Sequence, residues 1–222
     1  MSSLSTQMAA VTRRDLERER RTGEVLWITI PFGAIALILV PMAVGADVPL
    51  LRQIGPGLYW VVVMLFGVLI AVRRTSMETP AQRDLLALLG IDPAAVFGGR
   101  AMASGLMLLV FELIVGAVAV LFYDIDLSGW PWLLLVLPLA AAGLAALGTI
   151  AGSIATNATV GPALIPLIVA PLAVPLLLAA SEIVEGLRTD TGILRWLLLM
   201  VIVDLVLCIA GVVTARPLQE TQ

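Results

Sequence analysis

The amino-acid sequence predicts an all-α, polytopic membrane protein with six transmembrane helices. Hydrophobic residues make up 60% of its 222 residues, more than a water-soluble domain of this size requires. Several long runs have few or no charged side chains, and a bilayer core of about 30 Å needs roughly 20 helical residues to cross it. These runs also lack the apolar–polar alternation of membrane-spanning strands, which argues against a β-barrel.

The first predicted span follows a charged leader. Residues 1–24 hold five arginines, and residues 25–46 contain no charged side chain. A cleaved signal peptide is the alternative for this segment. However, the apolar run is long and the leader before it is about two dozen residues, which favours a membrane helix.

Three further charge-poor runs predict the second, third and sixth spans. Residues 53–72 contain no charged residue. Residues 101–123 contain only Glu112, and residues 196–215 contain only Asp204. Both carboxyls fall near the middle of their spans and are expected to be neutral, paired or exposed to water, since an isolated charge is costly at this depth. They are potential neighbours, either as a relay in a transport path or as an interhelical hydrogen bond.

The fourth and fifth spans come from one uninterrupted run. Residues 127–181 contain no charge over a length that crosses a bilayer twice, and Asn157, Gly161 and Pro162 predict the turn in the middle. In the fourth span, Gly148 and Gly152 form a G-x-x-x-G pattern, which permits close helix approach within one chain or across a dimer.

Prolines are expected to bend the fifth span. Pro166, Pro171 and Pro175 each lack a backbone N–H, so each removes a helical hydrogen bond when it lies in a helix interior. The bend is either a hinge or a fixed kink.

The arginines predict the orientation. All but three of the 13 arginines lie before the first span, between the second and third spans, or after the sixth. The positive-inside rule therefore places both termini in the cytoplasm. We expect a cytoplasmic leader at residues 1–24, a membrane domain at 25–216 and a cytoplasmic tail at 217–222.

The polar insertion between the second and third spans predicts a short amphipathic helix at about residues 79–90. A threonine cap is followed by proline at the first helical position, and leucines then gather on one side. The helix is too short to cross a bilayer. It is either an interfacial float or a docking element for a soluble ATPase. The residues expected to couple to such a partner are Glu78, Thr79, Arg83, Asp84, Leu85, Leu86 and Leu89.

The chain has no ATP site of its own. The phosphate-binding loop G-x-x-x-x-G-K-[ST] is missing, and the sequence contains no lysine that such a loop requires. If ATP drives this protein, a separate subunit binds it.

Four segments resemble the CcmB family, the permease subunits of the ABC transporter of cytochrome c maturation. They are Pro-Met-Ala-Val-Gly at 41–45, Leu-Leu-Arg-Gln-Ile-Gly-Pro-Gly at 50–57 with Tyr59 and Trp60, the leucine-rich stretch 84–93, and Pro-Leu-Ala-Val-Pro-Leu-Leu at 171–177. The stretch at 73–80 departs from the family, whose members often have a longer charged segment there.

The resemblance implies a type-2 ABC exporter permease fold, with an N-terminal interfacial elbow helix near residues 14–24 and a cytoplasmic coupling helix. It implies a permease homodimer with two CcmA-type ATPase subunits, associated with CcmC-, CcmD- and CcmE-type components in the bacterial inner membrane. ATP hydrolysis by the partner would drive haem handling or release of a haem-loaded chaperone on the outer face. The chain itself would be non-catalytic and would contact lipid but no nucleic acid.

We expect no stably bound haem, metal or other cofactor, although haem is a possible cargo. The chain lacks histidine, and its remaining axial-ligand types lie mostly in apolar spans, where methionine usually serves packing. These candidates are Tyr59, Met64, Met102, Met107, Met200 and Cys208.

Three other functions stay open from the sequence. The same six spans would serve an ABC exporter of drugs or lipid-linked glycans. A secondary transporter usually has inverted repeats, and none is convincing here. An intramembrane enzyme is disfavoured because neither carboxyl has a histidine or a clear nucleophile to act with.

Overall fold

The computed structural model describes residues 3–23, 25–45, 47–76, 88, 90–125, 129–157 and 161–220. Six helices in these ranges are long and apolar enough to cross a membrane, which confirms the predicted all-α class and the number of spans. The elements are α1 (Leu4–Thr22), a π-helical turn (Val25–Thr29), α2 (Ile30–Val44), α3 (Val48–Ser76), α5 (Pro93–Tyr123), α6 (Trp130–Asn157), a 3-10 turn (Gly161–Ala163), α7 (Leu164–Thr189) and α8 (Leu194–Glu220).

The observed helices extend beyond the charge-free runs. α3 continues to Ser76 and so includes Arg73 and Arg74, and α5 begins at Pro93. The start of α5 is capped, because the Asp92 side chain accepts a hydrogen bond from the N–H of Ala94. Charged residues at a helix end reach the membrane surface, so a charge-free run underestimates the length of the helix.

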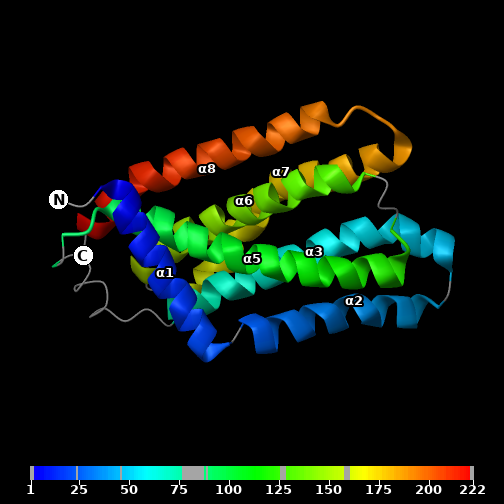
Figure 1. The fold of residues 1–222 in the computed structure, drawn as a ribbon, viewed down its shortest axis with the longest axis horizontal. Helices are drawn as coiled ribbons and strands as arrows, with labels where there is room; N and C mark the ends of the chain where they lie inside the picture. Colours follow the sequence, from blue (N-terminus) through cyan, green and yellow to red (C-terminus); the bar gives the residue numbers. More distant parts are fainter. Residues whose placement is uncertain are drawn as a thin grey trace.

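The spanning helices run side by side, and α1 lies across one end of the bundle (Figure 1). The end of α8 lies at this same end. α6 is the central helix, since it packs against α3, α5, α7 and α8 and 50% of its most apolar window is buried. The corresponding window of α8 is only 11% buried, which places α8 at the periphery.

The outer surface of the bundle is apolar. Large side chains such as Phe32, Leu134, Leu167 and Val213 are more than half exposed. A continuous apolar exterior of this kind is expected where lipid tails, rather than water, surround the helices. The interior is filled by buried side chains from several helices, including Val63, Phe111, Val136, Leu176 and Met200.

The glycines of the G-x-x-x-G pattern face α3. A Cβ atom at Gly148 would lie 2.9 Å from the Cβ of Ala71, and one at Gly152 would lie 2.6 Å from the Oγ1 of Thr75. Real Cβ atoms essentially never show contacts this short, so any larger residue would force α6 and α3 apart. The pattern therefore serves packing within the chain.

The prolines of the fifth span fall in two different settings. Pro171 and Pro175 lie inside α7, where each removes a helical hydrogen bond. Pro166 lies in the first turn of α7, which begins at Leu164. The first N–H groups of a helix have no acceptor within it, so the bend expected at Pro166 is not required.

α1 packs closely on the start of α5. The Oγ1 of Thr12 donates to the carbonyl oxygen of Gly99 at 3.1 Å. A Cβ atom at Gly99 would lie 2.7 Å from the Cβ of Val11 and 2.8 Å from the carbonyl oxygen of Met8. The absence of a side chain at this glycine lets the two backbones meet.

Arg74 joins α1, α3 and α5. From α3, its Nη2 donates to the Oδ2 of Asp15 in α1 at 2.5 Å. Its Nη1 donates to the carbonyl oxygen of Arg100 at 3.3 Å and to the hydroxyl of Ser104, both in α5. The side chains of Arg74 and Asp15 are 26% and 12% exposed, so water only partly screens this ion pair.

Replacing Arg74 with glutamine is expected to loosen α1 from the bundle. The substitution removes the guanidinium that reaches three helices and leaves the largely buried Asp15 carboxylate without its 2.5 Å partner. Loss of such a charge-assisted contact costs about 1–3 kcal/mol. Amide hydrogen exchange over Leu4–Thr22 should become roughly tenfold faster, measured by mass spectrometry on the purified protein.

The matched control is Arg13→Gln, which removes the same charge from α1. The Arg13 side chain is 82% exposed and, among the described residues, pairs with Glu17 one turn away on its own helix, so its removal should leave the exchange of α1 unchanged. Equal exchange in the Arg74 variant and the wild type would contradict the role given to Arg74.

Candidate functional site: a cationic cavity beneath α1

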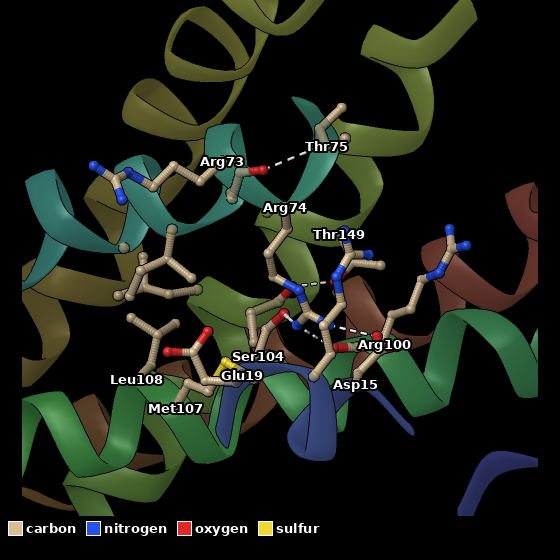
Figure 2. A pocket seen from close by; sticks show the side chains of 18 of the residues that line it. Asp15, Glu19, Arg73, Arg74, Thr75, Arg100, Ser104, Met107, Leu108 and Thr149 are labelled. Atoms are coloured by element: carbon tan, nitrogen blue, oxygen red, sulfur yellow. Dashed lines mark hydrogen bonds and ion pairs between the residues drawn. The ribbon is translucent and has the colours of Figure 1, made fainter. Parts of the chain in front are cut away.

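A cavity of about 120 Å³ lies between α1, α3, α5 and α6 (Figure 2). It lies at the end of the bundle where α1 crosses, which we call the arginine-rich end. Five arginines and two carboxylates line the cavity, so its wall carries three more positive than negative charges. These residues are Arg14, Arg18, Arg73, Arg74 and Arg100, with Asp15 and Glu19.

Hydroxyl and apolar side chains complete the lining. The hydroxyls are those of Thr22, Thr29, Thr75, Ser104, Thr149 and Ser153. Apolar side chains from three helices, including Met107, Leu108 and Leu144, form another part of the wall. The cavity is therefore amphipathic, with a cationic and hydroxyl-rich part beside an apolar part.

Most of the lining hydroxyls are already engaged in hydrogen bonds. The Oγ1 of Thr149 donates to the carbonyl oxygen of Ala145 at 2.7 Å, and the Oγ1 of Thr75 donates to that of Ala71 at 3.0 Å. Thr29 is different. It is 1% exposed, and its Oγ1 has no hydrogen-bond partner in the part of the chain that the structure describes.

The local backbone explains the setting of Thr29. It is the last residue of the π-helical turn Val25–Thr29, which connects the end of α1 to α2. π-Helical turns are rare and often occur at functional sites, because they redirect side chains out of the regular helical register. The turn thus places a buried hydroxyl at the wall of the cavity.

The chemistry of the cavity is that of anion binding. Guanidinium groups donate to carboxylate or phosphate oxygens in a planar fork, and hydroxyls add further donors. Within the described residues there is no group of three or more carboxylate or cysteine side chains that could hold a metal ion.

Outside the cavity, α1 carries an exposed ion pair. The Nε of Arg13 donates to the Oε1 of Glu17 at 2.7 Å. This hydrogen bond and the positive charge of Arg13 lower the pKa of the Glu17 carboxyl, and the same contact raises the pKa of Arg13. α1 thus has one face toward water and one face toward the cavity.

The two intramembrane carboxyls lie in different packing contacts. Glu112 is fully buried, and the hydroxyl of Tyr59 in α3 donates to its backbone carbonyl oxygen at 3.1 Å. Asp204 of α8 lies against α6, where a Cβ atom at Gly143 would clash with its Oδ1. Neither carboxyl has a hydrogen-bond partner among the described residues, and no described interaction joins them.

The predicted coupling residues lie outside the described residues. This applies to Glu78, Thr79, Arg83, Asp84, Leu85, Leu86 and Leu89. Of the neighbouring leucines, Leu88 is described, with a helical backbone and a side chain that is 85% exposed.

Sequence analysis did not identify the cavity. The arginines that line it were used only to predict orientation. The sequence does show that these arginines are grouped, since Arg73, Arg74 and Arg100 flank one insertion and the leader holds Arg14 and Arg18. No sequence pattern, however, indicated that α1 would cover the ends of α3 and α5.

Comparison with known proteins gives the family of the chain. The CcmB protein family matches residues 6–219. The chain is 28% identical over 188 residues to "Heme exporter protein B" of Rhodobacter capsulatus, which covers 82% of this chain and 86% of that protein. Proteins of the same name from Haemophilus influenzae and Pseudomonas aeruginosa are 25% and 31% identical, over 82% and 75% of this chain and 84% and 76% of their own lengths. The resemblance seen in the sequence is confirmed, and the chain belongs to the CcmB family.

Proposed function

We propose that the chain is the membrane permease subunit of an ABC transporter for haem export in cytochrome c maturation. The observation that carries this proposal is the family match over residues 6–219 in a chain with six spanning helices. In this role the chain is not an enzyme. A separate CcmA-type ATPase subunit binds and hydrolyses ATP, since the sequence has no lysine with which to build a phosphate-binding loop.

The segment between α3 and α5 is the proposed contact for that ATPase. α3 ends at Ser76 and α5 begins at Pro93, both at the arginine-rich end. The side chain of Leu88 is 85% exposed, so it is available for contact with a protein partner. Arg74 binds α1 and α5, so a force on the segment would reach three helices.

The proposed assembly is a permease homodimer with two ATPase subunits, joined by CcmC-, CcmD- and CcmE-type membrane components. ATP hydrolysis would be coupled to haem handling or to release of a haem-loaded chaperone on the outer face. The subunit would lie in the bacterial inner membrane with both termini in the cytoplasm. The excess of arginine at the end shared by α1 and the end of α8 supports this orientation (Figure 1).

We infer that the isolated subunit holds no stable haem. The chain has no histidine, the usual axial ligand. The hydroxyl of Tyr59 is engaged by a backbone carbonyl, and Met107 and Met200 are buried. The cavity of about 120 Å³ is smaller than the roughly 300–1,000 Å³ of pockets that enclose drug-sized ligands.

Introducing charge into the leucines of the insertion is expected to abolish ATPase binding. The double variant Leu85→Asp/Leu89→Asp places carboxylates where an apolar groove would receive the helix, and burying unpaired charge costs several kcal/mol. Co-purification of the co-expressed ATPase with the tagged permease should fall at least tenfold. Gln82→Asp is the matched control on the polar side and should retain the ATPase. Undiminished co-purification with the double variant would reject the docking role.

The haem inference predicts the spectrum of the purified protein. The subunit produced without partners, in cells supplied with haem, should show no Soret band at stoichiometric intensity. A stoichiometric band that survives gel filtration would contradict this expectation, and its loss in Met107→Leu but not in Met102→Leu would then locate the ligand.

Neutral replacements of the two intramembrane carboxyls should leave assembly intact. Glu112→Gln and Asp204→Asn keep the size of each side chain, and neither carboxyl has a described partner to lose. Assembly with the ATPase is measured by co-purification and cytochrome c maturation by haem staining. Loss of maturation with intact assembly assigns the carboxyl to transport, whereas full maturation assigns it to helix packing. Failure of either variant to assemble would contradict the prediction.

A further inference from the structure

We propose that the cationic cavity beneath α1 binds the phosphate headgroup of an anionic phospholipid. This inference does not rest on the proposed function, because it concerns how the chain holds lipid rather than what the transporter moves. It rests on the charge of the cavity, on one buried hydroxyl without a partner, on the size of the cavity and on its depth in the membrane.

The charge of the lining selects an anion. Arg14 and Arg18 come from α1, Arg73 and Arg74 from α3, and Arg100 from α5. The lining also has two carboxylates, so its net charge is positive. Figure 2 shows Arg74, Asp15 and Ser104 gathered where α1, α3 and α5 meet. Phosphate oxygens suit guanidinium groups, since each group donates two parallel hydrogen bonds.

The hydroxyl of Thr29 lacks a hydrogen-bond acceptor that a bound group would supply. Its side chain is 1% exposed and lines the cavity, and its hydroxyl has no hydrogen-bond partner among the described residues. A buried hydroxyl without a partner loses the hydrogen bonds that water would give it, which is costly. Rotation of this side chain toward the cavity would let a phosphate oxygen accept a hydrogen bond from the hydroxyl, which would remove that cost.

The size and location of the cavity favour a lipid headgroup. About 120 Å³ holds a headgroup while the acyl chains stay outside, where the exterior of the bundle is apolar. The cavity lies where α3 ends and α5 begins, the level at which lipid phosphates meet a spanning helix. Basic pockets between helices at this level are typical sites for anionic headgroups.

A bound headgroup would link α1 to the bundle. Its oxygens would contact arginines of three helices, the same helices that Arg74 already connects. The lipid would then reinforce the contact between α1 and the helices on either side of the proposed coupling segment.

The test measures lipid binding by the purified full-length protein in a neutral detergent. Titration with phosphatidylglycerol, followed by native mass spectrometry, should show one lipid bound in preference to phosphatidylcholine. Arg18→Gln and Arg100→Gln should each weaken phosphatidylglycerol binding about fivefold, the effect of one arginine near a lipid phosphate. Arg13→Gln removes a charge from α1 outside the cavity and should bind as the wild type does.

Thr29 provides a second, uncharged test. Thr29→Val keeps the shape of the side chain but removes the donor, and should weaken binding about tenfold, as expected for a hydrogen bond to a charged acceptor. Thr29→Ser retains the hydroxyl and should restore binding. Circular dichroism of each variant confirms folding, and the two arginine variants test the site independently if Thr29→Val does not fold.

Three results would overturn the proposal. The first is an equal loss of binding in Arg13→Gln and Arg18→Gln, which would mean that charge anywhere on α1 suffices. The second is equal binding of phosphatidylglycerol and phosphatidylcholine. The third is complete displacement of the lipid by millimolar inorganic phosphate, which would make free phosphate the ligand of the cavity.

Discussion

A bilayer core offers no water to polar groups, and this constraint accounts for most of the structure. Backbone groups must pair within each segment, so the described chain crosses the apolar layer only as helices. Charged side chains gather at the helix ends, where they meet one another and water. At the arginine-rich end the result is a cluster in which Arg74 of α3 reaches both Asp15 of α1 and the backbone of α5. Polar contacts that join α1, α3 and α5 are therefore found at the rim of the bundle.

The same constraint explains what the sequence could predict. Charge-free length predicted all six spans, and Asn157, Gly161 and Pro162 predicted the break between α6 and α7, because both signals are local. Both features were legible from neighbouring residues. The cavity was not, because its wall combines α1 with residues of α3, α5 and α6 that are far apart in the sequence. The π-helical turn at Val25–Thr29 was also not predicted, because its apolar residues resemble those of an ordinary helix.

α1 and the cavity are in contact with both helices that border the segment between α3 and α5. The segment is bounded by the end of α3 and the start of α5, and α1 is fixed to both helices through Arg74 and, at Gly99, through direct backbone contact. A partner that moves the segment would therefore move α1 as well as the spanning helices. An anion in the cavity would lie at the centre of this region. α1 therefore has a structural role of its own, because it covers the site at which α3 and α5 meet.

The glycines of α6 leave space both beside the cavity and deeper in the bundle. Near the arginine-rich end, Gly148 and Gly152 let α3 approach and also line the cavity, so any side chain at either position would disturb the packing and the cavity wall together. Further along the helix, Gly143 leaves the space that the carboxyl of Asp204 occupies. Glycines on two different faces of α6 thus make room for the cationic site, on the side of α3, and for an intramembrane carboxyl, on the side of α8. The G-x-x-x-G pattern is usually explained by helix association alone, but here the room that it leaves also holds polar groups. Larger residues at these positions would fill that space. The polar groups that lie against α6 therefore depend on its glycines.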